Sequence, residues 1–259
     1  HLGELEKAIA EPANARLLQE LDMAQALELS PTLRPAAVQL AAYEPNAADI
    51  DVNAVLQGYL KQLRDAGGQV VTSAGVKSLL RCGSAWQVET AAGVFSSATV
   101  VNAAGAWADE IAAMAGGAAV GLVPKRRTAL TFGPGLEIFK WPLTISADEN
   151  WYFRPEGGDL LISPADETLS EPCDAQPDEM DIALCIDRIQ TFTTMNVERL
   201  VSKRAGLRCF VFDKSPVVGY ADDVDGFLKF GLVNTSLRRA CWFSRNSCVM
   251  LGLSCAISS

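Results

Sequence analysis

The sequence predicts an α/β protein with an α+β composite character, in which an α/β unit is joined to a second, α+β layer. Three observations support this prediction. Apolar residues at helical spacing in residues 52–63 precede several β-type runs, and an apolar strand at residues 100–102 meets a helix directly through an Ala-Ala-Gly turn. From Arg126 onward, strand-like pieces precede one further helix. The 259 residues can bury a sizeable core in one large domain or in two interleaved smaller ones.

The first part of the chain is predicted to form a small helical region. Residues 2–29 are rich in Leu, Ala and Glu, and the interruption at Pro12 indicates two short helices. Pro31 and Pro35 then favour an extended stretch.

A longer helix is predicted from Val52, because apolar residues recur at helical spacing and Gly67 and Gly68 supply a C-terminal stop. The β-type runs after it are residues 69–72, 76–80, 86–90 and 99–102. In the next helix, Trp107, Ile111 and Met114 share one face.

The second half of the chain contains more predicted strands. They are residues 128–132, 143–146, 151–154 and 160–163, followed by a helix near residues 177–191 that acidic residues open. Two short strands at residues 209–212 and 217–220 precede a turn at residues 222–226. Beyond Asp225 no acidic residue and no helical or strand period occurs, and from this we expect a reading-frame error after about Phe227.

The strand-to-helix corner is a candidate ligand contact. Gly105 and the alanines beside it leave no bulk over the peptide groups, and the next helix directs N–H groups toward whatever binds there. A cofactor with a pyrophosphate or a polarised ring suits such a place. An ordinary buried turn explains the residue types equally well.

Composition excludes several classes of function. The net charge of −9, with one tight basic cluster at residues 125–127, argues against a nucleic-acid surface. His1 is the only histidine, which argues against Ser-His-Asp, Cys-His and His-metal chemistry. The seven cysteines form no Cys-x-x-Cys pair, so we expect no metal site, no disulfide framework and a cytoplasmic location. No apolar run is long enough to span a bilayer.

Three motifs occur in order along the chain. They are Val100-Val101-Asn102-Ala103-Ala104-Gly105-Ala106-Trp107, Trp151-Tyr152-Phe153-Arg154-Pro155, and Ala205-Gly206-Leu207-Arg208 followed by Pro216-Val217-Val218-Gly219. With these motifs, most of residues 36–228 resembles the FAD-dependent D-amino-acid oxidase superfamily, which includes glycine oxidase, sarcosine oxidase and bacterial D-amino-acid dehydrogenases. Segments at residues 124–127, 141–142, 163–165 and 176–178 are most similar to bacterial D-arginine dehydrogenases.

The resemblance implies a partial FAD-binding Rossmann-like domain interleaved with an antiparallel-sheet substrate domain. Residues 1–45 would form a helical part of the substrate or cap region, residues 46–121 and 201–228 the FAD-binding domain, and residues 122–200 the substrate-binding sheet. Residues 229–259 would be an atypical tail. The family's Gly-x-Gly-x-x-Gly turn is expected before His1, so we expect an N-terminally truncated fragment.

The resemblance also implies an activity. A bacterial-like flavoprotein oxidoreductase would oxidise the CH–NH2 group of D-amino acids, D-arginine and other basic or apolar ones, to imino acids and 2-oxo acids by hydride transfer to FAD. The acceptor of its electrons, a quinone, a dye or oxygen, stays open, as does a location peripheral to the inner membrane. The alternatives are a flavoenzyme of the glycine or sarcosine oxidase type and an inactive flavoprotein-like binding subunit.

Family position assigns roles to individual residues. Arg208 would bind the substrate carboxylate, Tyr152 would complete that contact, and Arg127 would be a second pocket arginine. Leu143 and Ile145 would line the pocket, although core packing explains them as well. A surface ion pair is the alternative for Arg208, and a half-buried strand aromatic for Tyr152.

The implied cofactor contacts are mostly backbone contacts. Val76 would meet the FAD adenine, and Ala104 and Gly105 would lie near the pyrophosphate and the ribityl chain. Ala103 and Trp107 complete this set of expected cofactor-binding residues.

Overall fold

The computed structural model describes residues 2–11, 17–231 and 250–251. The chain divides into two compact units whose segments alternate along the sequence. Unit 1 comprises His1–Asp49, Arg126–Thr168 and Ala175–Gly206, and unit 2 comprises Ile50–Lys125, Leu169–Asp174 and Leu207–Ser259. The mixture of helices with antiparallel sheets confirms the predicted fold class. Which segments bind a cofactor and which bind substrate stays a prediction.

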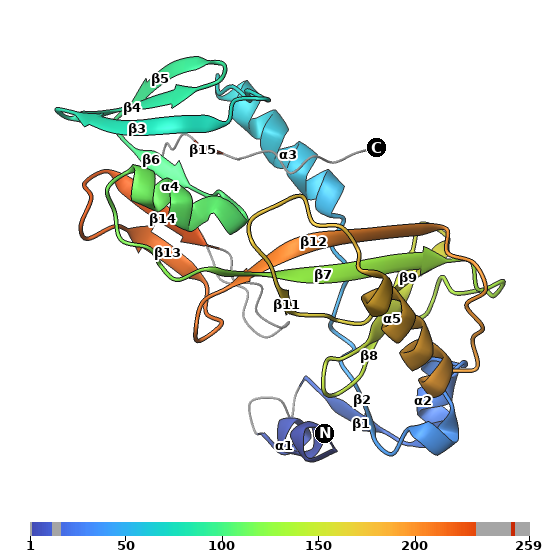
Figure 1. The fold of residues 1–259 in the computed structure, drawn as a ribbon. Coiled ribbons are helices and arrows are strands. Elements are labelled where there is room, and N and C mark those ends of the chain that lie inside the picture. Colours follow the sequence, from blue (N-terminus) through green and yellow to red (C-terminus); the bar gives the residue numbers. More distant parts are fainter. Residues whose placement is uncertain (1, 12–16, 232–249, 252–259) are drawn as a thin grey trace. The chain divides into compact units, whose positions relative to one another are not determined.

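Unit 1 is built around a six-stranded sheet (Figure 1). Its strand order is β11-β7-β10-β9-β8, and β12 also pairs with β7. The strands are β7 (Val123–Phe132), β8 (Thr144–Ile145), β9 (Tyr152–Glu156), β10 (Asp159–Ser163), β11 (Thr168–Leu169) and β12 (Ser202–Phe210). The β7, β10, β9 and β8 pairings are antiparallel. Along the chain, β7 and β12 each continue from one unit into the other.

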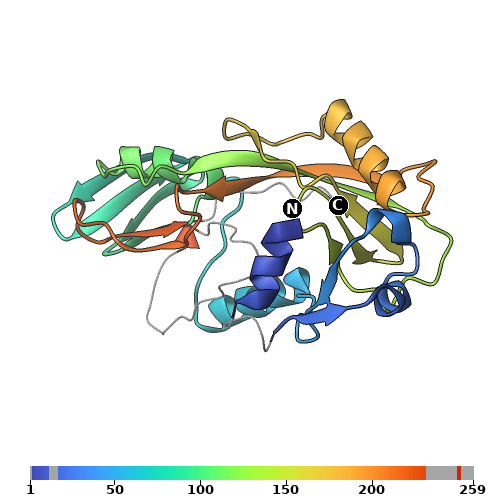
Figure 2. The same ribbon diagram turned by 90° about the horizontal axis from the view of Figure 1, so that it is seen from below.

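Helix α5 (Glu179–Phe192) covers one face of this sheet (Figure 2). Asp178 caps the helix by accepting a hydrogen bond from the Met180 N–H, and acidic residues in the first turn suit the positive end of the helix dipole. The predicted helix is thus confirmed. Its buried side chains, Ile182, Cys185 and Ile189, join the core.

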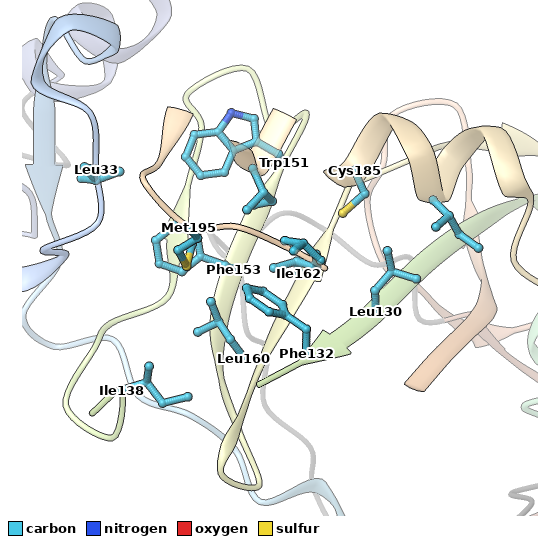
Figure 3. Packing of buried hydrophobic residues seen from close by; sticks show 13 residues of the cluster. Leu33, Leu130, Phe132, Ile138, Trp151, Phe153, Leu160, Ile162, Cys185 and Met195 are labelled. Atoms are coloured by element: carbon cyan, nitrogen blue, oxygen red, sulfur yellow. The ribbon is translucent and has the colours of Figure 1, made fainter. Parts of the chain in front are cut away.

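The core of unit 1 lies between α5 and the sheet (Figure 3). Its aromatic centre is a stack in which the Trp151 ring lies 6.0 Å from Phe153 and 5.2 Å from Phe192 between ring centroids. The Cys185 thiol is fully buried, and this burial raises its pKa to about 12. Apolar burial on this face therefore fixes which side of each strand points inward.

The N-terminal part of unit 1 contains the two short helices predicted. They are α1 (Leu2–Ala10) and α2 (Met23–Leu29), and α2 begins at a capping box between Asp22 and Gln25. Short strands β1 (Gln19–Leu21) and β2 (Ala41–Tyr43), which the sequence pattern did not indicate, pair antiparallel. The stretch predicted to be extended at Pro31 and Pro35 needs correction. Residues 31–32 form a turn, Leu33 makes an isolated β-bridge, and Pro35 begins a 3-10 turn, η1 (Pro35–Ala37).

Unit 2 begins with α3 (Val52–Asp65), which confirms the predicted long helix; Gly67 ends it at a φ of 80°. A three-stranded antiparallel sheet follows, formed by β3 (Val76–Cys82), β4 (Ala85–Thr90) and β5 (Gly93–Ser97). A four-stranded sheet has the order β13-β14-β6-β15. Its strands are β6 (Val100–Asn102), β13 (Val217–Tyr220), β14 (Phe227–Gly231) and β15 (Met250–Leu251).

Two strand predictions need correction. Residues 69–72 form no strand, because no segment of the described chain pairs with them and Val70 and Val71 stay exposed. The strand predicted at residues 209–212 instead spans Ser202–Phe210. Of the tail predicted to be atypical, residues 229–231 belong to β14 and residues 250–251 form β15; the rest of that segment lies outside the described residues.

Candidate active site

The strand-to-helix corner of unit 2 has the geometry that close approach of a ligand requires. Strand β6 is buried along its whole length and pairs in parallel with β14. It leads through Ala103 and Ala104 into the 3-10 turn η2 (Gly105–Trp107) and then into α4 (Ala108–Met114). The N–H groups at the start of such a turn have no acceptor within it, so they can face a ligand.

Gly105 occupies the left-handed region, with a φ of 57°, where a side chain would be strained. A Cβ atom placed on Gly105 would meet no heavy atom of the described residues within 4 Å. Open space therefore lies directly beside the backbone of the corner. This space fits a cofactor that contacts peptide groups rather than side chains.

The other expected cofactor residues lie in the same unit. Val76 begins β3, where the pairing with β4 is irregular between Val76 and Ser78. Val76 and Trp107 are half-buried and pack against the core of unit 2. Packing alone accounts for the burial of these two side chains, whereas Ala103, Ala104 and Gly105 form the corner itself.

On the substrate side, two of the expected residues are direct neighbours in unit 1. Tyr152 begins β9 and lies opposite Ile145 of β8 in the antiparallel register. The Ile145 side chain is 42% exposed and Leu143, just before β8, is 39% exposed. Both residues are thus available to line a pocket and do not belong to the core.

Strand register places Arg127 on the same sheet face as Tyr152. Leu161 of β10 lies opposite both Arg154 of β9 and Thr131 of β7. Since side chains alternate between faces, Arg127, Thr131, Tyr152 and Arg154 share the face turned away from the aromatic core. Arg127 and Tyr152 lie two strands apart and are offset by two residues along the strand direction. In an ideal sheet, this places their Cα atoms about 12 Å apart.

The Arg127 guanidinium is largely buried, with 13% of its side chain exposed. Its Nη2 lies 3.4 Å from Glu167 Oε1, and its Nε is buried without a hydrogen-bond acceptor among the described residues. A buried donor without an acceptor is costly, so a ligand oxygen at this atom would be stabilised.

Arg208 lies near the end of β12, in the part of that strand that belongs to unit 2, and it is half-buried. Tyr152, Arg127, Leu143 and Ile145 belong to unit 1.

The sheet face that carries Tyr152 also carries a chain of ion pairs, which the sequence did not lead us to expect. Arg154 contacts Asp49 at 3.2 Å and Glu156 at 2.9 Å, and Glu156 also accepts a 2.6 Å contact from Arg204. The alternation of Tyr152, Arg154 and Glu156 along one strand was the available signal. These pairs give the face a fixed set of charges.

The opposite face of β7 carries Arg126, whose role differs from that of its neighbour. Its Nη2 lies 2.7 Å from Asp181 at the start of α5. Its Nε lies 3.8 Å from Asp166 and, like the Arg127 Nε, has no hydrogen-bond acceptor among the described residues. Asp166 also accepts hydrogen bonds from the backbone and the hydroxyl of Thr128. Burial, helped by the nearby Asp181 carboxylate, raises the pKa of Asp166 despite these bonds.

The chain belongs to the DAO family of FAD dependent oxidoreductases, whose family model matches residues 1–236. FAD, the cofactor expected from the sequence, is the cofactor of this family. The solved structures that are similar to this chain carry the names of enzymes with different substrates. Glycine oxidase from Geobacillus kaustophilus superposes with a TM-score of 0.71 at 20% identity, over 88% of this chain and 59% of that one.

Two further solved structures show the same fold. L-proline dehydrogenase from P. horikoshii has a TM-score of 0.73 at 19% identity, covering 83% of this chain and 58% of that one. L-alpha-glycerophosphate oxidase from Mycoplasma pneumoniae with FAD bound has a TM-score of 0.72 at 18% identity, covering 89% and 64%. The chain spans about three fifths of the length of these structures.

Two further properties concern the described part of the chain. None of its helices combines the length and the apolar character needed to cross a membrane. No group of three or more His, Cys, Asp or Glu residues within it could hold a metal ion.

Proposed function

We propose that this protein is a flavoenzyme that oxidises the CH–NH2 group of D-amino acids, including D-arginine and other basic or apolar ones. The observation that carries the proposal is the corner at Gly105, where a left-handed glycine leaves open space beside the backbone. A family of FAD-dependent enzymes supplies the chemical context.

Ala103, Ala104 and Gly105 would hold FAD through their backbone, and Val76 would contact it from the start of β3. Bound FAD supplies a two-electron acceptor for the hydrogen on the α-carbon. The chain's own residues then have to bind and orient the substrate. An amine that binds uncharged needs no protein base at the α-carbon, which agrees with the lack of a histidine after His1.

The proposed substrate contacts are electrostatic. Arg208 would bind the carboxylate through a planar two-point contact, and the Tyr152 hydroxyl would complete it. Arg127 would offer its buried Nε to a second ligand oxygen. Leu143 and Ile145 would give the pocket apolar walls, which suits uncharged parts of the side chain.

A second candidate is oxidation of glycine or an N-substituted glycine. It is supported by two glycine oxidases among the similar structures, with TM-scores of 0.71 and 0.74. We further propose a cytoplasmic location or one peripheral to the inner membrane, and either a quinone-type acceptor or oxygen for the electrons.

The test is a titration of the 259-residue chain with FAD, followed by anaerobic addition of D-arginine, D-alanine, glycine or sarcosine. Loss of the yellow flavin absorbance with the D-amino acids supports the first proposal, and loss with glycine or sarcosine alone supports the second. FAD uptake without reduction by any of the four would contradict both and favour a binding subunit.

A pair of variants isolates the role of Arg208. Arg208→Met should retain FAD and raise the substrate concentration needed for reduction at least about 100-fold, because a bidentate charged contact is lost. Arg199→Met is the matched control, since Arg199 is exposed and lies outside the strands. Equal behaviour of the two variants would remove Arg208 from the site.

A further inference from the structure

The side chain of Asn102 bridges both sides of the cofactor corner. Its Nδ2 donates a hydrogen bond to the Ala108 carbonyl at 2.7 Å, and its Oδ1 accepts one from the Ala104 N–H at 3.3 Å. We infer that Asn102 is a positioning residue that fixes the backbone of residues 103–108 in the conformation FAD contacts. This inference rests on the proposed function of the corner.

The main chain of Asn102 is itself held on both sides. It ends β6, where it lies opposite Lys229 of β14 and Leu251 of β15 in parallel pairings. The residue is 3% exposed, so its amide cannot exchange its two backbone partners for water. The Asn102 main chain is therefore held between two paired strands, and its side chain contacts the backbone of the turn that follows.

No other side chain in the described structure takes over this task. Neither Ala104, which precedes η2, nor Trp107, which precedes α4, makes a side-chain capping bond. Gly105 between them is the most conformationally free residue type. Without Asn102, the backbone of the corner would become ordered only when FAD binds. The free energy of that ordering would reduce the affinity for FAD.

The experiment compares FAD affinity and backbone protection in the 259-residue chain and three variants. Asn102→Leu keeps the side-chain size and removes both bonds, and Asn102→Asp keeps the acceptor for Ala104 alone. Thr90→Val is the matched control. Thr90 is equally buried in unit 2 and likewise bonds the backbone of a turn, through Gly93 and Ala92, but that turn joins β4 and β5.

Asn102→Leu should weaken FAD binding about tenfold or more, the factor that one ordinary hydrogen bond contributes, whereas Thr90→Val should leave it within about twofold. Without FAD, amide exchange at Ala104 should accelerate in Asn102→Leu and stay slow in Asn102→Asp. This exchange readout separates loss of the corner from general unfolding, which would expose both turns.

Equal weakening of FAD binding by Asn102→Leu and Thr90→Val would overturn the positioning role, as would unchanged Ala104 exchange in Asn102→Leu. A wild-type chain that takes up no FAD would instead refute the proposed function of the corner, and the inference about FAD would fall with it. The two failures are thus distinguishable by the wild-type titration.

Discussion

Replacement of Gly105 by alanine tests whether the open space at the corner belongs to a cofactor. In the left-handed region an L side chain costs about 1–2 kcal/mol relative to glycine. Because the new Cβ atom would meet no heavy atom of the described residues within 4 Å, no clash with them adds to this strain. We therefore expect the free energy of unfolding to fall by about 1 kcal/mol, or about 2–4 °C in Tm for a chain of this size.

The effect on FAD should be larger than this strain, because the methyl group would occupy space that the cofactor needs. Overpacking of a fitted contact costs about 1–3 kcal/mol, which corresponds to about 5- to 150-fold in Kd. The assay is thermal unfolding without FAD combined with fluorescence titration of FAD.

Gly116→Ala is the matched control for this experiment. Gly116 follows α4 in unit 2 and has a φ of 76°, and a Cβ atom built on it would likewise meet no described residue within 4 Å. It should show the same loss of stability with an unchanged Kd for FAD. If both variants bind FAD equally, whether weakly or well, the space beside Gly105 is not a cofactor contact and the reasoning is refuted.

Three further outcomes follow from the described contacts. Gly226→Ala should lose about 3 kcal/mol or more in urea unfolding, because its Cβ atom would lie 2.7 Å from the Ala98 carbonyl oxygen; a loss as small as that of Gly105→Ala would contradict this. The pKa of Asp166 is raised by burial, so lowering the pH from 7 toward 4 should stabilise the wild type relative to Asp166→Asn. The protonated Asp166 carboxyl favours the folded state below its raised pKa. A difference in unfolding free energy between the two proteins that does not change with pH would contradict this. Mass-spectrometric mapping after alkylation at pH 8 should find exposed Cys173 modified and Cys185 intact until unfolding, since burial raises the Cys185 pKa to about 12.

Much of the helical structure could be predicted because helix signals are local. Helix α3 combined apolar periodicity with a glycine stop, and α5 combined an acidic first turn with an apolar face. Strands depend on partners, which the sequence pattern does not show. Val70 and Val71 have strand-like side chains but no partner strand among the described residues. Strand β5 has only two such side chains, Val94 and Phe95, beside Gly93 and two serines, and it forms because β4 pairs with it.

The roles assigned to the candidate site residues stay predictions, and their arrangement could not be predicted from the sequence. The Tyr152–Ile145 pairing depends on a register between two strands, and the sequence between them does not determine that register. Asn102 was visible as a polar residue at the end of an apolar strand. Its role became apparent only when the structure showed that one amide reaches both Ala104 and Ala108.

The adjacent residues Arg126 and Arg127 show why register decides function. Alternation along β7 sends them to opposite faces of the sheet, and the buried aromatic core determines which face each one receives. Arg126 is therefore committed to Asp166 and Asp181 beneath α5, where it holds the helix against the sheet. Both arginines keep a buried Nε without a hydrogen-bond acceptor among the described residues, but only Arg127 lies on the face of Tyr152. A shift of β7 by one residue would exchange these environments, so the packing of the core and the chemistry of the proposed substrate face depend on the same register.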